Sequence, residues 1–198
     1  MKIDDDDFTL FDLPRGFALD SAALAQRWRA LQTEVHPDRF AAEGAAAQRV
    51  AMQWAVRVNE AYRRLKDPLA RATYLCELAG HRLDPHDNQA LPPAFLTQQM
   101  EWHEALADAS SADAVKALDA EVNGQLQALR DDVQADLDQR HDAQAALPKL
   151  RQWMFLAKLR VEIERRLEAL EAEPGPSEPA AGSREPGEGP RACKPAGW

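Results

Sequence analysis

The stretch TEVHPDRF at residues 33–40 lies between two long segments with helical periodicity. Before it, apolar residues recur at intervals of four, three and four, on one face of a helix: Leu24, Trp28, Leu31 and Val35. After it, a similar stripe covers residues 46–66: Ala47, Val50, Trp54, Val58, Ala61 and Leu65. Pro37 ends the first helix, because the residue before a proline disfavours helical conformation. Two long helices joined by a short connection predict an antiparallel hairpin.

Short elements flank this predicted hairpin. An apolar cluster over residues 8–13 forms one or two helical turns, and Asp20 is a good N-cap for the first long helix. After Pro68, a short helix over residues 69–79 ends at Gly80, a residue type suited to that position. The aspartates at positions 4–7 are expected to form a solvated acidic tip, and a hard-cation site is the disfavoured alternative.

The second half predicts a three-helix bundle. Pro93 suits the first position of a helix over residues 93–108, and Ser110 or Ser111 can cap the next helix. That helix carries an apolar stripe from Val115 to Leu137, and a last helix covers residues 143–170 with Pro148 near its start. The chain is therefore expected to be all-α and to divide into residues 1–80, a linker at 81–93, a bundle at 94–171 and a disordered Pro/Gly-rich tail at 172–198.

Composition excludes several classes of function. The formal net charge of −9 disfavours a nucleic-acid binder, which needs a basic face. Two cysteines, Cys76 and Cys193, cannot build a disulfide framework or a four-cysteine zinc site, which fits a reducing, cytoplasmic compartment. The start of the chain does not have the pattern of a signal peptide, and no apolar run of about 18 residues could span a membrane. The histidines lack metal-site spacing, so no metal or cofactor is expected.

The triplet His36-Pro37-Asp38 has three possible meanings on its own. It could be a simple turn, because Pro and Asp are turn residues. It could supply two members of a catalytic triad, but Ser21 lies a whole helix away and Cys76 sits in an apolar helix. It could also be a polar docking loop beside a basic helix face, where it would fix the register of a partner with an acidic patch.

With its flanking helices, this triplet resembles the J domain of DnaJ-like co-chaperones. The second helix ends in the same way, with Asn59, Ala61, Tyr62, Leu65 and Pro68 at matching positions. The resemblance implies that the first segment binds the ATPase domain of a heat-shock-70-type chaperone. The residues that it assigns to this contact are His36, Pro37, Asp38, Arg27, Arg29 and Arg39.

A J domain followed by an acidic bundle is similar to the HscB family, the J-type co-chaperones of iron–sulfur cluster assembly. Four motifs match that family: residues 8–14, 68–75, 95–101 and 155–160. The resemblance implies a chaperone partner of the HscA class and a bundle that binds an IscU-type scaffold protein. The matching scaffold-binding positions are Leu96, Met100, Glu101, Glu104 and Phe155, although Thr97 stands where the family often has a larger apolar residue.

These residues leave alternatives open. Leu96, Met100 and Phe155 could all be core residues, but Phe95 and Leu96 are adjacent and cannot share a helix face, so one of them must point away from the core. An adaptor co-chaperone without enzymatic activity is the expected function. A general J-domain co-chaperone for unfolded clients is the alternative, disfavoured because the chain lacks a Gly/Phe-rich linker and a Cys-rich zinc module. A hydrolase using His36 and Asp38 lacks a nucleophile and a pocket.

Overall fold

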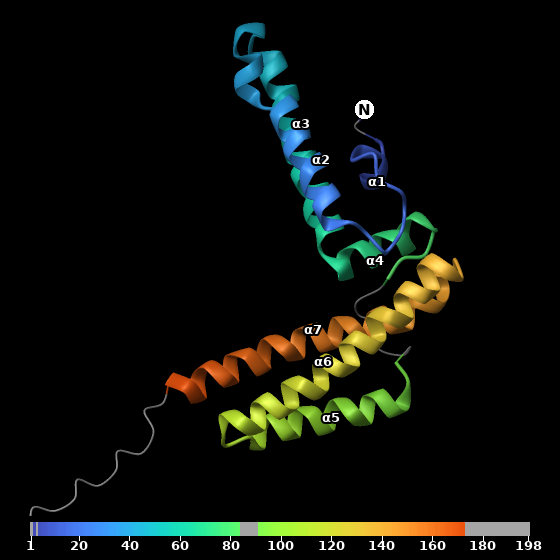
Figure 1. Cartoon of the computed structure of the whole chain (residues 1–198), viewed down its shortest axis with the longest axis vertical. Helices are drawn as coiled ribbons and strands as arrows, with labels where there is room; N and C mark the ends of the chain where they lie inside the picture. Colours follow the sequence, from blue (N-terminus) through green and yellow to red (C-terminus); the bar gives the residue numbers. More distant parts are fainter. Residues whose placement is uncertain (1, 3, 84–90, 173–198) are drawn as a thin grey trace, which may run out of the picture.

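The computed structural model describes residues 2, 4–83 and 91–172 of the 198-residue chain. These residues form α-helices with short 3₁₀ and π segments, and no strand occurs among them. The helices are α1 (Asp7–Leu10), α2 (Ser21–Glu34), α3 (Ala45–Lys66), α4 (Pro68–Leu78), α5 (Pro93–Asp108), α6 (Ala112–Gln134) and α7 (Ala143–Ala172). The predicted all-α class, with a helical hairpin followed by a three-helix bundle, is confirmed (Figure 1).

The predicted helix ends follow from local hydrogen bonding. The Asp20 carboxylate accepts hydrogen bonds from the Ala22 and Ala23 amides at the start of α2, as expected of an N-cap. Ser111 caps α6 by accepting from the Ala114 amide, which decides between the two serines. Gly80 follows the end of α4 with a φ of 87°, a conformation that favours glycine.

The connection in the hairpin is more ordered than the sequence predicted. Residues Pro37–Glu43 form a 3₁₀ helix between α2 and α3. Val50 is 53% exposed at this end of α3, so its assignment to the buried stripe was wrong, and Ala51 is buried instead. At 3.6 residues per turn, Val50 lies about 80° around the helix from the buried Val58, whereas Ala51 lies about 20° away.

The core consists of two clusters that meet at α4. One cluster fills the hairpin and contains Phe8, Phe11, Leu24, Val58 and Leu65. The other fills the bundle but also includes Phe17, Ala72 and Cys76 from the first segment, while Leu75 packs against both clusters. The two halves are therefore packed against each other through α4 and α7 (Figure 1).

Polar and aromatic contacts reinforce this joint. The Asp138 carboxylate, on the π-helical turn Ala135–Gln139, accepts hydrogen bonds from the Phe17 and Ala18 amides at 2.6 and 2.8 Å. The Phe17 ring meets the Trp153 ring edge-on at 6.1 Å, and the Arg71 guanidinium lies 5.2 Å from its centroid. The proposed linker at 81–93 thus bridges segments that are already in contact, and its residues 84–90, like the proposed tail after residue 172, lie outside the described residues.

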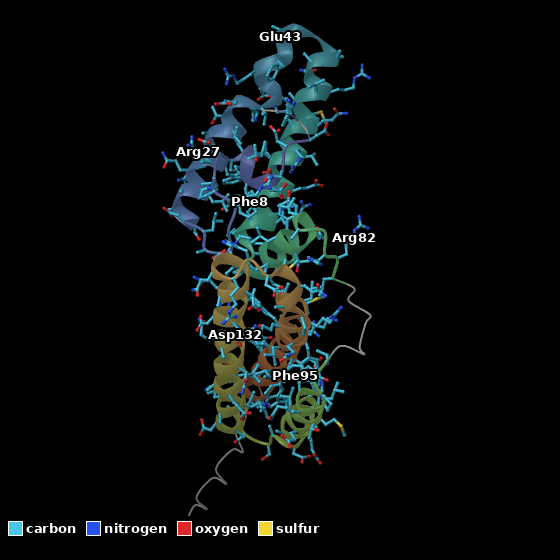
Figure 2. The ribbon with its side chains drawn as sticks, turned by 90° about the vertical axis from the view of Figure 1, so that its right-hand side faces the viewer. Phe8, Arg27, Glu43, Arg82, Phe95 and Asp132 are labelled. Carbon is cyan, nitrogen blue, oxygen red and sulfur yellow. The ribbon has the colours of Figure 1, made fainter. Side chains whose placement is uncertain are left out.

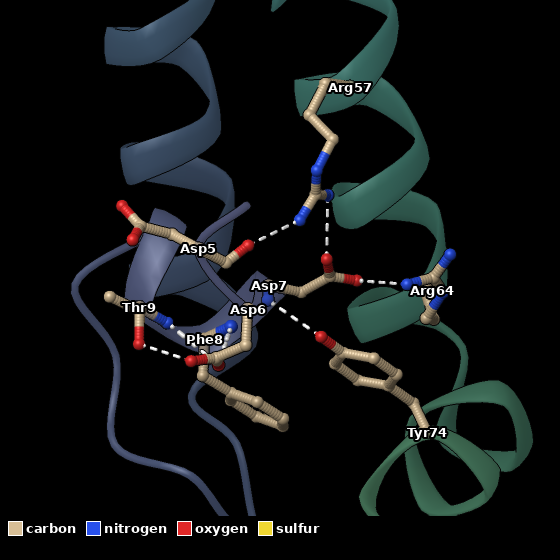
Figure 3. Close-up of polar contacts among 8 residues, drawn as sticks. All are labelled: Asp5, Asp6, Asp7, Phe8, Thr9, Arg57, Arg64 and Tyr74. Atoms are coloured by element: carbon tan, nitrogen blue, oxygen red, sulfur yellow. Dashed lines mark hydrogen bonds and ion pairs between the residues drawn. The ribbon is translucent and has the colours of Figure 1, made fainter. Parts of the chain in front are cut away.

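The expectation that the aspartates at positions 4–7 form a solvated acidic tip is wrong for Asp7, which is buried. Its carboxylate is fully buried and pairs with Arg57 at 2.7 Å and Arg64 at 3.0 Å, both on α3. Its backbone amide donates to the Tyr74 hydroxyl on α4 at 3.0 Å (Figure 3). The acidic run therefore ties α1 to the hairpin and to α4, because α3 places two arginines seven residues apart on the side that α1 covers.

Replacing Asp7 with Asn should cost about 2 kcal/mol or more of unfolding free energy. Removing one member of a fully buried ion pair costs about 3–5 kcal/mol, and the loss here is smaller because both arginines remain partly exposed. Urea denaturation followed by circular dichroism measures the change. Asp4→Asn is the matched control, because Asp4 is exposed and its loss should change the stability by less than about 0.5 kcal/mol. Equal stabilities for the two variants would contradict this role of Asp7.

Asp6 is expected to make the stability of the folded chain sensitive to acid. Burial raises the pKa of its carboxyl, but hydrogen bonds from Arg15 and Thr9 outweigh burial and lower the pKa from 3.8 to about 2. A pKa that is lower in the folded state stabilises the fold above about pH 4, and this contribution is lost as the pH falls towards 2. The stability difference between the wild type and Asp6→Asn should therefore shrink between pH 4 and pH 2 in urea titrations. A difference that stays constant over this range would show that Asp6 does not contribute in this way.

Candidate functional site

The predicted chaperone-binding loop follows the C-terminal end of α2. The His36 ring nitrogen Nδ1 accepts a hydrogen bond from the Asp38 amide at 3.3 Å, so His36 caps the 3₁₀ helix that Pro37 begins. Both the His36 and Asp38 side chains are exposed. This local bonding holds the triplet in one conformation while its polar groups still face solvent.

The structure brings together only part of the predicted basic surface. Arg29, His36 and Arg39 line one hollow, together with Gln32 and Thr33, which the sequence did not single out. The Arg39 guanidinium folds back to donate to the Thr33 carbonyl at 3.2 Å. Arg27 lies elsewhere on α2, because two residues correspond to about 200° of rotation, and it pairs with Asp12 at 2.7 Å. We call the set Arg29, His36, Pro37, Asp38 and Arg39 the loop surface.

The groups considered for a catalytic triad are not placed for catalysis. Ser21 is the first of the 14 residues of α2 and His36 follows the end of this helix, which spans about 21 Å at 1.5 Å per residue. Burial raises the pKa of the Cys76 thiol to about 11, and the thiol contacts the Ala143 carbonyl in the core. Neither group could act as a nucleophile with His36.

The predicted scaffold-binding residues lie on α5 and α7, two helices of the bundle that contact each other. Leu96 is 41% exposed and Met100 is 73% exposed, so neither is a core residue. Phe155 is half-buried and packs against the bundle core. Phe95 turns inward and meets the Phe155 ring edge-on at 5.7 Å, so Leu96 is the member of the pair that points outward. We call Leu96, Met100 and Phe155 the apolar patch.

Acidic side chains accompany the apolar patch. Glu101 and Glu104 are both exposed on α5. The Thr97 hydroxyl donates to the Pro93 carbonyl one turn earlier at 3.3 Å. Figure 2 shows Glu43, the last residue of the 3₁₀ helix that begins at Pro37, at the top of the molecule and Phe95 on α5 near the bottom. The loop surface and the apolar patch thus lie towards opposite ends of the packed molecule.

The chain is similar to known proteins over most of its length. Residues 91–164 match the family described as the HSCB C-terminal oligomerisation domain. A curated relative, the co-chaperone protein HscB homolog of Bordetella petrii, is 51% identical over 160 residues, which cover 80% of this chain and 94% of the relative. The chain belongs to the HscB co-chaperone family. A second HscB homolog, from Burkholderia multivorans, is 49% identical over 174 residues, covering 86% of this chain and 99% of its own.

Solved HscB structures share the fold. The chaperone HscB from Vibrio cholerae is 37% identical, with a TM-score of 0.74 over 84% of this chain and 99% of its own. Human co-chaperone HscB is 29% identical, with a TM-score of 0.79 over 84% of each chain. Both HscB proteins therefore match the hairpin and the bundle together. Within the described ranges, no helix is long and apolar enough to cross a membrane.

Proposed function

We propose that this HscB-family chain is an adaptor co-chaperone in the cytoplasm. Its J domain stimulates ATP hydrolysis by a dedicated heat-shock-70-type chaperone of the HscA class, and its bundle delivers an IscU-type iron–sulfur scaffold protein. The chain itself performs no bond chemistry. It favours one conformation of the chaperone, and so shifts the chaperone population towards hydrolysis.

The exposure of Leu96 and Met100 carries this proposal. Apolar surface in contact with water costs about 25 cal/mol per Å², and a partner that covers it recovers that free energy. Two large side chains one turn apart, with glutamates beside them, have the composition of an apolar interface centre with a polar rim. The glutamates would set register and association rate for a partner with a basic surface.

The packed joint supports a role that requires two partners at once. Asp138, Phe17 and Trp153 hold the bundle against the J domain, so a scaffold on the apolar patch and a chaperone on the loop surface would occupy separate ends of one body. This arrangement favours an adaptor over a J protein that only stimulates its chaperone.

A calorimetric titration separates the adaptor from the general co-chaperone for unfolded clients. We expect folded IscU-type scaffold to bind the full chain and a reduced, unfolded peptide of similar length to bind far more weakly. Binding of the unfolded peptide alone would favour the general co-chaperone and would contradict the adaptor proposal.

A further inference from the structure

His103 lies between the two parts of the apolar patch. On α5 it follows Leu96 and Met100 at intervals of four and three residues, so the three side chains share one helix face. Its ring meets the Phe155 ring on α7 edge-on, with centroids 5.6 Å apart and an interplanar angle of 86°. His103 therefore connects the α5 face that carries Leu96 and Met100 to Phe155 on α7.

A second contact from α7 restrains the His103 ring. Its Nδ1 lies 3.6 Å from Oε2 of Glu162, and both side chains are about half exposed. One turn further along α7, Arg166 donates to the Ala109 carbonyl at the end of α5 at 2.8 Å. The imidazole is thus held from two directions, by an aromatic edge and by a carboxylate.

The Phe155 ring lies between two other rings, those of Phe95 and His103. It is half-buried, and the rings of Phe95 and His103 each approach it in a T-shaped arrangement. Phe95 contacts it from the buried side, because Phe95 also packs edge-on against the buried Trp102. His103 contacts it from the exposed stripe of α5, where a partner would bind.

We propose that His103 is a positioning residue of the scaffold-binding surface, which holds the Phe155 ring so that the ring joins Leu96 and Met100 in one continuous apolar contact. This inference rests on the proposed function of the bundle. It assigns the effect to the ring of His103, with the Glu162 contact as a restraint on its orientation. Because exposed ion pairs contribute little free energy, the contact between the His103 and Phe155 rings should have a larger effect on scaffold binding than the contact between His103 and Glu162.

Scaffold titrations with three substitutions at position 103 test the role of the ring. An aromatic pair is worth roughly a 2- to 10-fold change in an equilibrium constant, so His103→Ala, which frees the Phe155 ring, should raise the Kd for folded scaffold by more than twofold and by up to about 10-fold. His103→Phe keeps the edge-on ring and should restore binding to within about twofold of the wild type, whereas His103→Gln keeps only the polar contact and should bind like His103→Ala. Lys116→Ala is the matched control, because it breaks another exposed ion pair between bundle helices, with Glu171, and should bind normally.

A double-mutant cycle with Phe155→Leu tests whether His103 acts through Phe155. Leucine keeps most of the packing but removes the ring, so His103→Ala should add no further loss in this background. Normal binding by His103→Ala or His103→Gln, or a full additional loss in the Phe155→Leu background, would overturn the inference alone. Absence of scaffold binding by the wild-type chain would instead overturn the proposed function and the inference together.

Discussion

Replacing His36 with Gln should abolish stimulation of the partner chaperone's ATPase. The His36 side chain is exposed and belongs to neither apolar core, so its main structural task is to cap a single 3₁₀ helix. Loss of such a cap costs about 1 kcal/mol, which leaves the helical fold intact. Steady-state ATP hydrolysis by an HscA-class chaperone, with circular dichroism of the variant, measures both quantities.

His81, which follows Gly80 beyond the end of α4, provides the control for this substitution. His81→Gln makes the same chemical change at a position outside the loop surface and should stimulate hydrolysis like the wild type. Stimulation by His36→Gln that remains within twofold of the wild type would contradict the docking role of the loop.

Truncating Leu96 and Met100 together to Ala should abolish most of the binding to folded scaffold. Central apolar anchors commonly contribute about 2 kcal/mol or more each, although not additively, so the Kd should rise at least about 30-fold. Because both side chains are exposed, the double variant should melt close to the wild type. Calorimetric titration paired with a melting curve reports both effects.

A matched control for this variant lies on α3. Val50 and Met52 are also exposed apolar residues of a long helix, and their double truncation should leave scaffold binding unchanged. Phe155→Ala differs from both variants, because Phe155 packs on the core and its loss should also lower the melting temperature. A Leu96/Met100 variant that binds normally would remove these residues from the interface, and one that unfolds would place them in the core.

The helices could be predicted because their signals are local. Stripes at intervals of three and four residues, the cap at Asp20 and the glycine after α4 act within one or two turns, so the sequence alone contains the relevant contacts. The prediction was less accurate where packing against other parts of the chain determines the local structure or the burial of a residue. A 3₁₀ helix follows His36, where the sequence analysis predicted only a connection between two helices. Val50 is exposed because its position on α3 faces away from the hairpin core.

Contacts between distant segments could not be predicted in the same way. The burial of Asp7 requires Arg57 and Arg64 on α3, and their seven-residue spacing beside an acidic run is the signal that could have suggested the pairing. The packing of Phe17 on Trp153 joins residues 136 positions apart, and local periodicity carries no information about it. The division into two domains with a linker at 81–93 therefore stays a proposal.

The residues of the two candidate sites could be predicted from the sequence, but their arrangement on the surface of the protein could not. The adjacency of Phe95 and Leu96 predicted that one would face outward, and the structure assigns this to Leu96. The different faces of Arg27 and Arg29 could have been found from helix geometry, since residues two positions apart in a helix do not share a face. The contact between His103 and Phe155 required the packing of α5 against α7.

Single-turnover ATP hydrolysis by an HscA-class chaperone, with this chain and folded scaffold added separately and together, tests the adaptor role most directly. We predict that the two together accelerate hydrolysis by more than the sum of their separate effects, and that the Leu96→Ala/Met100→Ala variant removes this excess but keeps the stimulation by the J domain. Strictly additive effects of chain and scaffold, or an excess that persists in the double variant, would show that the chain does not act as an adaptor.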